Sequence, residues 1–203
     1  MLDARNARRE QQWLAVAAKR YAGCTLENLQ RYHASQDVAY QRIREYASNL
    51  PQRLANGESL ILFGPKGSGK DHAAAGVIRP AFMAGRTARR VNGPDLQGDS
   101  RDAMCGRDTS ERELVERYST PDWLWLSDPI CPGGDLTSHQ ATILYRILEG
   151  RYAAVLPSVV TVNAVDLKDL ETRLGPAILD RLRHNATIVH CAWPSFRARE
   201  VAQ

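Results

Sequence analysis

The sequence contains no run of about 20 apolar residues, the length that an α-helix needs to cross a bilayer, so no membrane span is expected. It has no internal repeat and no low-complexity tract, which argues against repeat architectures and compositionally biased linkers. Arginines near the N-terminus are followed by neither an apolar segment nor a small-residue cleavage site. We therefore do not expect a secretory signal.

Cysteines are few and widely spaced, without a C-x-x-C pair: Cys24, Cys105, Cys131 and Cys191. This pattern favours reduced thiols in a cytoplasmic protein over a disulfide framework or a zinc site. The 203 residues, 43% apolar and 25% charged, suit one globular domain with a sizeable core and some terminal additions. The net charge of +4 permits an acidic partner such as nucleic acid but does not by itself indicate one.

The most informative stretch runs from Ser59 to Asp71 and reads SLILFGPKGSGKD. An apolar segment breaks at Gly64, a glycine-spaced loop follows, and an Ala-rich segment that favours helix begins after Lys70. This order matches the phosphate-loop pattern G-x-x-x-x-G-K-[ST] at every position except the last. Backbone N–H groups of such a loop face an anion, and the lysine reaches the outer phosphates. The nucleotide-binding residues expected here are Gly64, Pro65, Lys66, Gly67, Ser68, Gly69, Lys70, Asp71 and His72.

Apolar strands alternate with helices along the rest of the chain, which predicts a parallel sheet covered on both faces, a three-layer α/β/α fold. The strands are expected near residues 60–63, 87–91, 123–126, 158–162 and 187–191. The helices are expected over residues 3–20, 35–53, 71–85, 111–118, 137–151, 167–174 and 176–183. Ser110 with Glu113, and Thr137, are the expected N-terminal caps.

Polar residues close two of the buried strands. Asp128 follows Ser127 at the end of the WLWL strand, and Asn163 ends the VVTV strand. Taken alone, an Asp or Asn at a strand end is ordinary turn chemistry. Because ligands of parallel sheets bind at the carboxyl ends of the strands, however, Gly64, Asp128 and Asn163 are expected to converge. Arg181 lies near a predicted helix C-terminus, where a cation is stabilising in any case, or it serves as an arginine finger.

These motifs, in this order, resemble the helicase-loader and transposition-helper branch of the AAA+ ATPases, the DnaC and IstB type. The similarity covers residues 21–199, leaving residues 1–20 as a basic helical arm and residues 200–203 as a tail. The arm is interpreted as a solvated or partner-docking helix, with direct nucleic-acid contact as the alternative. The segments that carry the resemblance are Thr25–Leu29 near the adenine, Gly64–Lys70 (Walker A), Trp123–Asp128 (Walker B), Glu149–Tyr152, Asn163 (sensor 1) and Arg181 (arginine finger).

The resemblance implies a P-loop AAA+ core that binds ATP with Mg²⁺ and hydrolyses it weakly. Its implied catalytic residues are Lys70, Asp128, Asn163 and, from another subunit, Arg181. The implied partners are a replicative helicase or another ATPase subunit, single-stranded DNA, and further copies of the chain in a nucleotide-dependent homo-oligomer. Residues 94–118 fall where this branch inserts extra helices, and its helical lid is expected to be absent.

Two positions depart from the family pattern. The Walker A hydroxyl is replaced by Asp71, and the first Walker B acid is replaced by Ser127. We hypothesise a reciprocal swap in which Asp71 and Ser127 trade roles around one Mg²⁺ while Asp128 remains to orient water, since this ion accepts carboxylate and hydroxyl oxygens alike. The candidate metal-site residues are Asp71, Ser127 and Asp128. In the alternative register, Asp128 is the metal ligand and Pro129 replaces the catalytic acid, so that ATP is bound but poorly hydrolysed.

Other functions share the same phosphate machinery. A transposition helper, a non-hydrolysing ATP-binding scaffold and a small-molecule kinase remain alternatives, because fold alone does not fix function. Five arginines are candidates for DNA phosphate contact, although a solvated surface explains them equally well: Arg86, Arg89, Arg90, Arg101 and Arg107.

Overall fold

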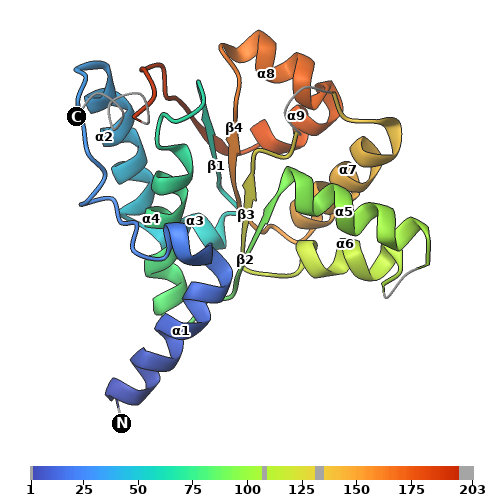
Figure 1. Ribbon diagram of the computed structural model, residues 1–203, viewed down its shortest axis with the longest axis horizontal. Coiled ribbons are helices and arrows are strands. Elements are labelled where there is room, and N and C mark those ends of the chain that lie inside the picture. The colour runs from blue at the N-terminus through green and yellow to red at the C-terminus, as the bar shows by residue number, and fades with distance from the viewer. Residues whose placement is uncertain (1, 107–108, 131–134, 197–203) are drawn as a thin grey trace.

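A five-stranded parallel sheet forms the centre of the molecule (Figure 1). The computed structural model describes residues 2–106, 109–130 and 135–196. The strands are β1 (Ser59–Phe63), β2 (Ala88–Asn92), β3 (Trp123–Ser127), β4 (Ser158–Val162) and β5 (Ala186–His190). They lie in the order β2-β3-β4-β1-β5, and every pairing is parallel. The parallel sheet expected from the apolar strands is thus confirmed.

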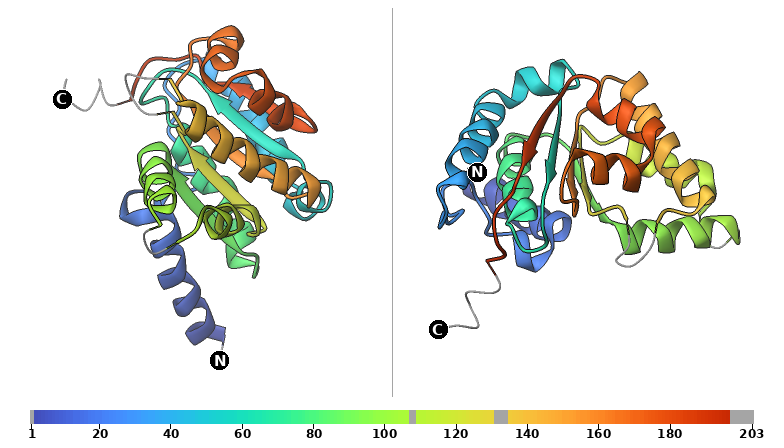
Figure 2. Two further views of the ribbon diagram at one scale, coloured as in Figure 1. Left: turned by 90° about the vertical axis from the view of Figure 1, so that its right-hand side faces the viewer. Right: turned by 90° about the horizontal axis from the view of Figure 1, so that it is seen from above.

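Helices cover both faces of the sheet, which confirms the three-layer α/β/α fold (Figures 1 and 2). One face carries α1 (Leu2–Tyr21), α2 (Ser35–Ala47), α3 (Leu50–Ala55) and α4 (Lys70–Met83). The other carries α5 (Gly93–Met104), α6 (Glu111–Ser119), α7 (Ser138–Ala153), α8 (Leu167–Leu174) and α9 (Pro176–Arg183). Each face has its own apolar core, because successive strand residues point to opposite sides: Leu60 and Leu62 to the first, Ile61 and Phe63 to the second.

Local capping explains where several helices begin. Ser110 and Thr137 each form a capping box, as expected for α6 and α7. The single helix expected over residues 35–53 is wrong, since Asn49 accepts a hydrogen bond from the Gln52 amide and starts α3 as a separate helix. The side chain of Asn92, the last residue of β2, caps α5 by accepting a hydrogen bond from the Asp95 main-chain amide.

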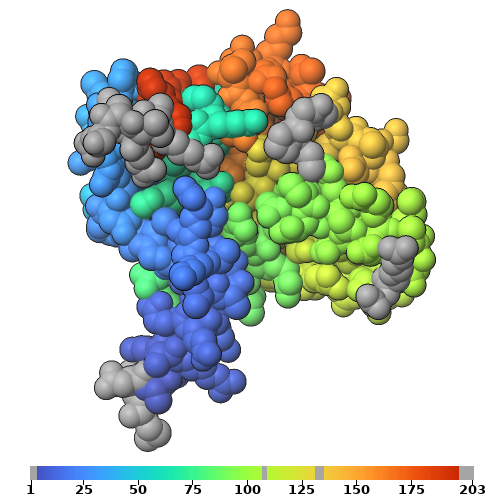
Figure 3. All heavy atoms as spheres, in the orientation of Figure 1, coloured from blue at the N-terminus to red at the C-terminus, as the bar shows by residue number. Residues whose placement is uncertain are grey.

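The N-terminal helix α1 is partly embedded in the domain. Trp13 and Ala17 are fully buried within the core of the first face. The backbone is non-helical at Ala18 (φ 61°, ψ 157°), which redirects the last residues of α1 toward the sheet. The earlier turns of α1 project from the body of the molecule (Figure 3). Among the described residues, no helix is both long enough and apolar enough to cross a bilayer.

Candidate nucleotide-binding site

A cleft of about 970 Å³ opens at the carboxyl ends of β1, β3 and β4. The loop between β1 and α4 forms its floor, and the segment between α1 and α2 forms one wall. Most residues expected to bind the nucleotide line it: Lys66, Gly67, Ser68, Gly69, Lys70, Asp71 and His72. Asp128 and Asn163 line the same cleft, as expected of these strand ends, whereas Gly64 and Pro65 are not among its lining residues and contact Lys70 through their carbonyl oxygens.

Glycines 67 and 69 adopt positive φ angles of 79° and 83°, which lets the loop curl back before α4 begins at Lys70. The Lys70 ammonium is buried and donates hydrogen bonds to the carbonyl oxygens of Gly64 (2.8 Å) and Pro65 (2.7 Å). It also lies 3.3 Å from Ser68 Oγ. These hydrogen bonds hold the loop folded around the Lys70 ammonium group, whose positive charge would attract a phosphate.

The segment after β5 packs directly on this loop, a feature that the sequence did not suggest. The Phe196 amide donates to the Gly67 carbonyl (2.9 Å), and Trp193 Nε1 donates to the Ser68 carbonyl (2.9 Å). A Cβ atom at Gly69, whose φ is 83°, would lie 2.9 Å from the Phe196 ring, so a side chain there would strain the backbone and displace the ring. The Phe196 ring also meets Tyr32 edge to face, with 5.4 Å between ring centroids.

Asp71 accepts three side-chain hydrogen bonds on the same oxygen, Oδ1. The donors are Ser127 Oγ at 2.8 Å, Thr161 Oγ1 at 2.9 Å and Trp125 Nε1 at 3.2 Å. Within the described residues, no hydrogen bond is made to its other oxygen, Oδ2. Asp71 and Ser127, 56 positions apart in the sequence, are therefore in direct contact.

Asp128 is held by Asn163 at the junction of β3 and β4. The main-chain N–H of Asn163 donates to Asp128 Oδ1 (3.2 Å), and the side-chain amide of Asn163 donates to Asp128 Oδ2. Burial raises the pKa of Asp128, opposed by these hydrogen bonds and by the positive charge of Lys70. The backbone of Asp128 is left-handed (φ 46°), uncommon for a residue with a side chain. Its carbonyl oxygen would lie 2.4 Å from a Cβ at Gly93, so glycine is required at the start of α5.

His72 joins the beginning of α4 to the wall of the cleft. Its Nε2 lies 2.9 Å from the Thr25 carbonyl oxygen and 2.7 Å from Asn28 Oδ1. The backbone of α4 also lies close to the segment between α1 and α2, because a Cβ at Gly76 would lie 2.7 Å from the Leu26 amide nitrogen. Burial lowers the pKa of His72, and the hydrogen bond to Thr25 partly offsets the effect.

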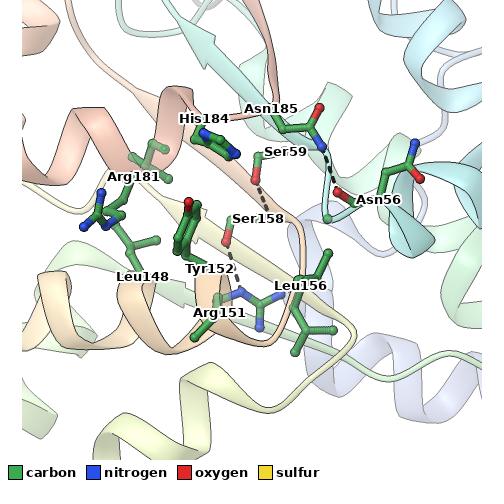
Figure 4. A pocket seen from close by; sticks show the side chains of 14 residues that line it. Asn56, Ser59, Leu148, Arg151, Tyr152, Leu156, Ser158, Arg181, His184 and Asn185 are labelled. Atoms are coloured by element: carbon green, nitrogen blue, oxygen red, sulfur yellow. Dashed lines mark hydrogen bonds between the residues drawn. The ribbon is translucent and has the colours of Figure 1, made fainter.

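Arg181 does not join these residues. It lines a separate pocket of about 330 Å³ that includes Ser59 and Ser158, the first residues of β1 and β4 (Figure 4). It is therefore at the amino ends of the strands, separated from the phosphate loop by their length, about 15 Å at ~3.3 Å per residue. Its guanidinium pairs with Glu149 and Asp180 and lies 5.1 Å from the ring centroid of Tyr152.

A family model for the IstB-like ATP binding protein matches residues 2–203. The chain belongs to this family. It is 25% identical over 180 residues to the replicative helicase loader DnaC of Escherichia coli K12, covering 88% of this chain and 71% of that protein. It is 23% identical over 154 residues to an insertion sequence IS232 ATP-binding protein of Bacillus thuringiensis, covering 72% and 58%. A crystal structure of the DnaC helicase loader superimposes with a TM-score of 0.72 at 22% identity, over 85% of this chain and 99% of that one.

The fold is thus that of a P-loop AAA+ protein, and the cleft is the candidate ATP site of this IstB-like protein. Its metal-binding potential follows from the donor chemistry. Among the described residues, no group of three or more His, Cys, Asp or Glu side chains gathers as a metal cage. Mg²⁺ needs none, because it is held by one or two carboxylates together with phosphate oxygens and water. The carboxylates of Asp71 and Asp128 and the hydroxyl of Ser127 fit that requirement.

Proposed function

We propose that this chain is a weak Mg²⁺-dependent ATPase that acts with a replicative helicase on single-stranded DNA. The observation that carries the proposal is the position of the Asp128–Asn163 pair in the same cleft as the phosphate loop and Lys70. Similarity to a helicase loader supports the choice of partner. Single-stranded DNA is assigned from the same resemblance, with Arg86, Arg89 and Arg101 as candidate contacts; Arg107 lies outside the described residues.

In this reading Lys70 exchanges the loop carbonyls for the outer phosphates of ATP. Asp128 orients the attacking water and accepts its proton, and the hydrogen bonds from Asn163 fix the direction in which the carboxylate faces. Because burial raises the pKa of Asp128, its proton affinity moves toward the working pH, as suits a general base.

The contact between Asp71 and Ser127 supports the reciprocal swap. Ser127 donates its only proton to Asp71, so its oxygen keeps a lone pair with which it could bind a metal ion. The three donors fix Asp71 Oδ1 and orient Oδ2 as the second oxygen ligand. When bound, Mg²⁺ supplies charge that offsets the repulsion between the Asp71 carboxylate and the phosphates.

A double-mutant cycle separates the swap from the alternative register. Under the swap, Asp71→Thr and Ser127→Asp each weaken Mg²⁺-dependent ATP binding, and the double variant recovers it. Recovery is expected because the hydroxyl and the carboxylate then simply exchange places across the same 2.8 Å contact. If the double variant is no better than the worse single variant, Asp128 is the metal ligand and the swap is wrong.

Multiple-turnover phosphate release tests the proposed activity. We expect slow release by the wild-type chain, stimulation by single-stranded DNA, and loss of release in Lys70→Ala. ATP binding without release in any condition would instead identify a non-hydrolysing scaffold.

Transposition help is the second candidate, favoured by the similarity to the IS232 protein. A transposition helper would respond to double-stranded DNA and to a transposase rather than to a helicase. Comparing phosphate release with single- and double-stranded DNA at equal nucleotide concentration distinguishes the two functions.

A further inference from the structure

Arg90 lies on β2, beside the part of the site where Asp71 is held. It is paired in register with Trp125 of β3, so the two side chains leave the same face of the sheet. Its guanidinium carbon lies 4.9 Å from the Trp125 ring centroid and 5.0 Å from that of Tyr21. Arg90 was a candidate for DNA contact on sequence grounds, but its side chain is partly buried between these rings and faces the site.

Arg90 contacts two of the three residues that hold Asp71. Its Nη2 lies 3.4 Å from Ser127 Oγ, and its guanidinium packs on Trp125; Ser127 and Trp125 both donate to Asp71 Oδ1. Arg90 forms no ion pair within the described part of the chain, and its buried Nε has no hydrogen-bond partner there. Its charge therefore lies one hydroxyl group away from the carboxylate of Asp71, with no acidic side chain paired to it.

We propose that Arg90 is the internal counter-cation of Asp71 and the positioning residue of the Ser127 hydroxyl. Arg90 donates to one lone pair of Ser127 Oγ, which directs the hydroxyl proton to Asp71 and leaves the second lone pair available to a metal ion. Its charge reduces the repulsion between Asp71 and an incoming phosphate. Asp71, Ser127 and Arg90 then act as one unit. This inference rests on the proposed ATP and Mg²⁺ site.

The position of Arg90 also connects the site to the N-terminal helix. Tyr21, the last residue of α1, reaches the guanidinium because the helix is interrupted at Ala18. Its ring meets Trp125 at 5.4 Å, so Tyr21 and Trp125 together confine the arginine. An aromatic surround attracts the cation without neutralising it, which leaves its charge available to Asp71.

The test is ATP affinity measured in Mg²⁺ and in EDTA for the wild-type chain and Arg90→Met, by fluorescence of a labelled ATP analogue. Arg90→Met keeps a long side chain between the rings but removes the charge. We expect ATP affinity in EDTA to fall about tenfold, as for loss of one nearby charge at an effective dielectric near 20, and affinity in Mg²⁺ to change less. Arg90→Lys, which keeps the charge, should restore most of the affinity in EDTA.

Two further variants decide whether the loss of charge or the loss of packing causes the change in ATP affinity. Arg44→Met removes an arginine of α2 whose guanidinium carbon lies 5.8 Å from the ring centroid of Tyr40, away from the residues that line the cleft, and should leave both affinities unchanged. In an Asp71→Asn background, Arg90→Met should no longer alter the EDTA-to-Mg²⁺ ratio. Equal losses in both conditions, or an unchanged effect in that background, would overturn the inference. If the wild-type chain binds no ATP at all, the proposed function fails instead.

Discussion

His72 makes the cleft sensitive to pH. Because burial lowers its pKa, the folded chain holds this side chain neutral under conditions where the unfolded chain, with its pKa near 6.5, already binds a proton. Stability should therefore decrease as the pH falls from about 6.5 toward the lowered pKa, and be unaffected by His72 above that range. Urea unfolding at a series of pH values, compared between wild type and His72→Asn, measures this contribution.

The variant should have a flatter dependence of unfolding free energy on pH in that window. The other four of the five histidines remain in the variant and provide the internal reference. Identical slopes for the two proteins would contradict the prediction.

Some contacts between individual residues could be predicted from the sequence, and others could not. Asp71 and Ser127 could be paired in advance, because a phosphate loop and a strand end of a parallel sheet meet at the same edge. The contribution of Arg90 could not, because it depends on β2 lying beside β3 in this register and on the turn of the backbone at Ala18. Nothing in the local sequence of residues 89–91, Arg-Arg-Val, distinguishes an arginine that faces the site from one that faces solvent.

Residues 191–196, the segment after β5, contact the phosphate loop through Trp193 and Phe196 and are called the clasp. Trp193→Phe removes the hydrogen bond to the Ser68 carbonyl and leaves a buried acceptor unpaired, which should reduce unfolding free energy by about 1–2 kcal/mol. Nucleotide affinity should also fall, since the loop is held less firmly. Unfolding in urea and labelled-ATP titration measure the two effects.

Trp13→Phe is the matched control for the clasp. Trp13 is fully buried on the same face of the sheet and also donates through Nε1 to a main-chain carbonyl, that of Ala22. It should lose comparable stability and keep its nucleotide affinity. A similar loss of affinity in both variants would mean that the clasp has no specific effect on the loop.

Elements whose ends carry local signals were predicted well. The capping boxes of α6 and α7 lie where Ser110 and Thr137 indicate, because cap chemistry involves only four consecutive residues. The division between α2 and α3 was missed, although Asn49 followed by Pro51 is itself a start signal. The clasp was missed for another reason: its contacts join residues more than 120 positions apart, which no periodicity records.

At the scale of the whole molecule, the two ends of the sheet carry different parts of the proposed machinery. The phosphate loop lies at the carboxyl ends of the strands and Arg181 at the amino ends. A side chain cannot bridge that separation, so the proposed arginine-finger role of Arg181 requires the ATP site of another subunit. In the isolated chain, Glu149 and Asp180 pair with it and Tyr152 packs against it. In the proposed oligomer, Arg181 would exchange these contacts for a phosphate bound to the neighbouring subunit.

Mixing two inactive variants tests action between subunits. Lys70→Ala should bind no ATP, and Arg181→Ala should bind ATP but hydrolyse it poorly, by analogy with other arginine fingers. In a random equimolar mixture with head-to-tail contacts, about one interface in four combines an intact Lys70 site with an intact Arg181, so about a quarter of wild-type phosphate release should return. Arg183→Ala, at the exposed end of the same helix, is the control and should hydrolyse ATP as wild type does. If Arg181→Ala alone keeps wild-type hydrolysis, or if the mixture assembles without recovering it, Arg181 is not an arginine finger and its ion pairs with Glu149 and Asp180 are structural.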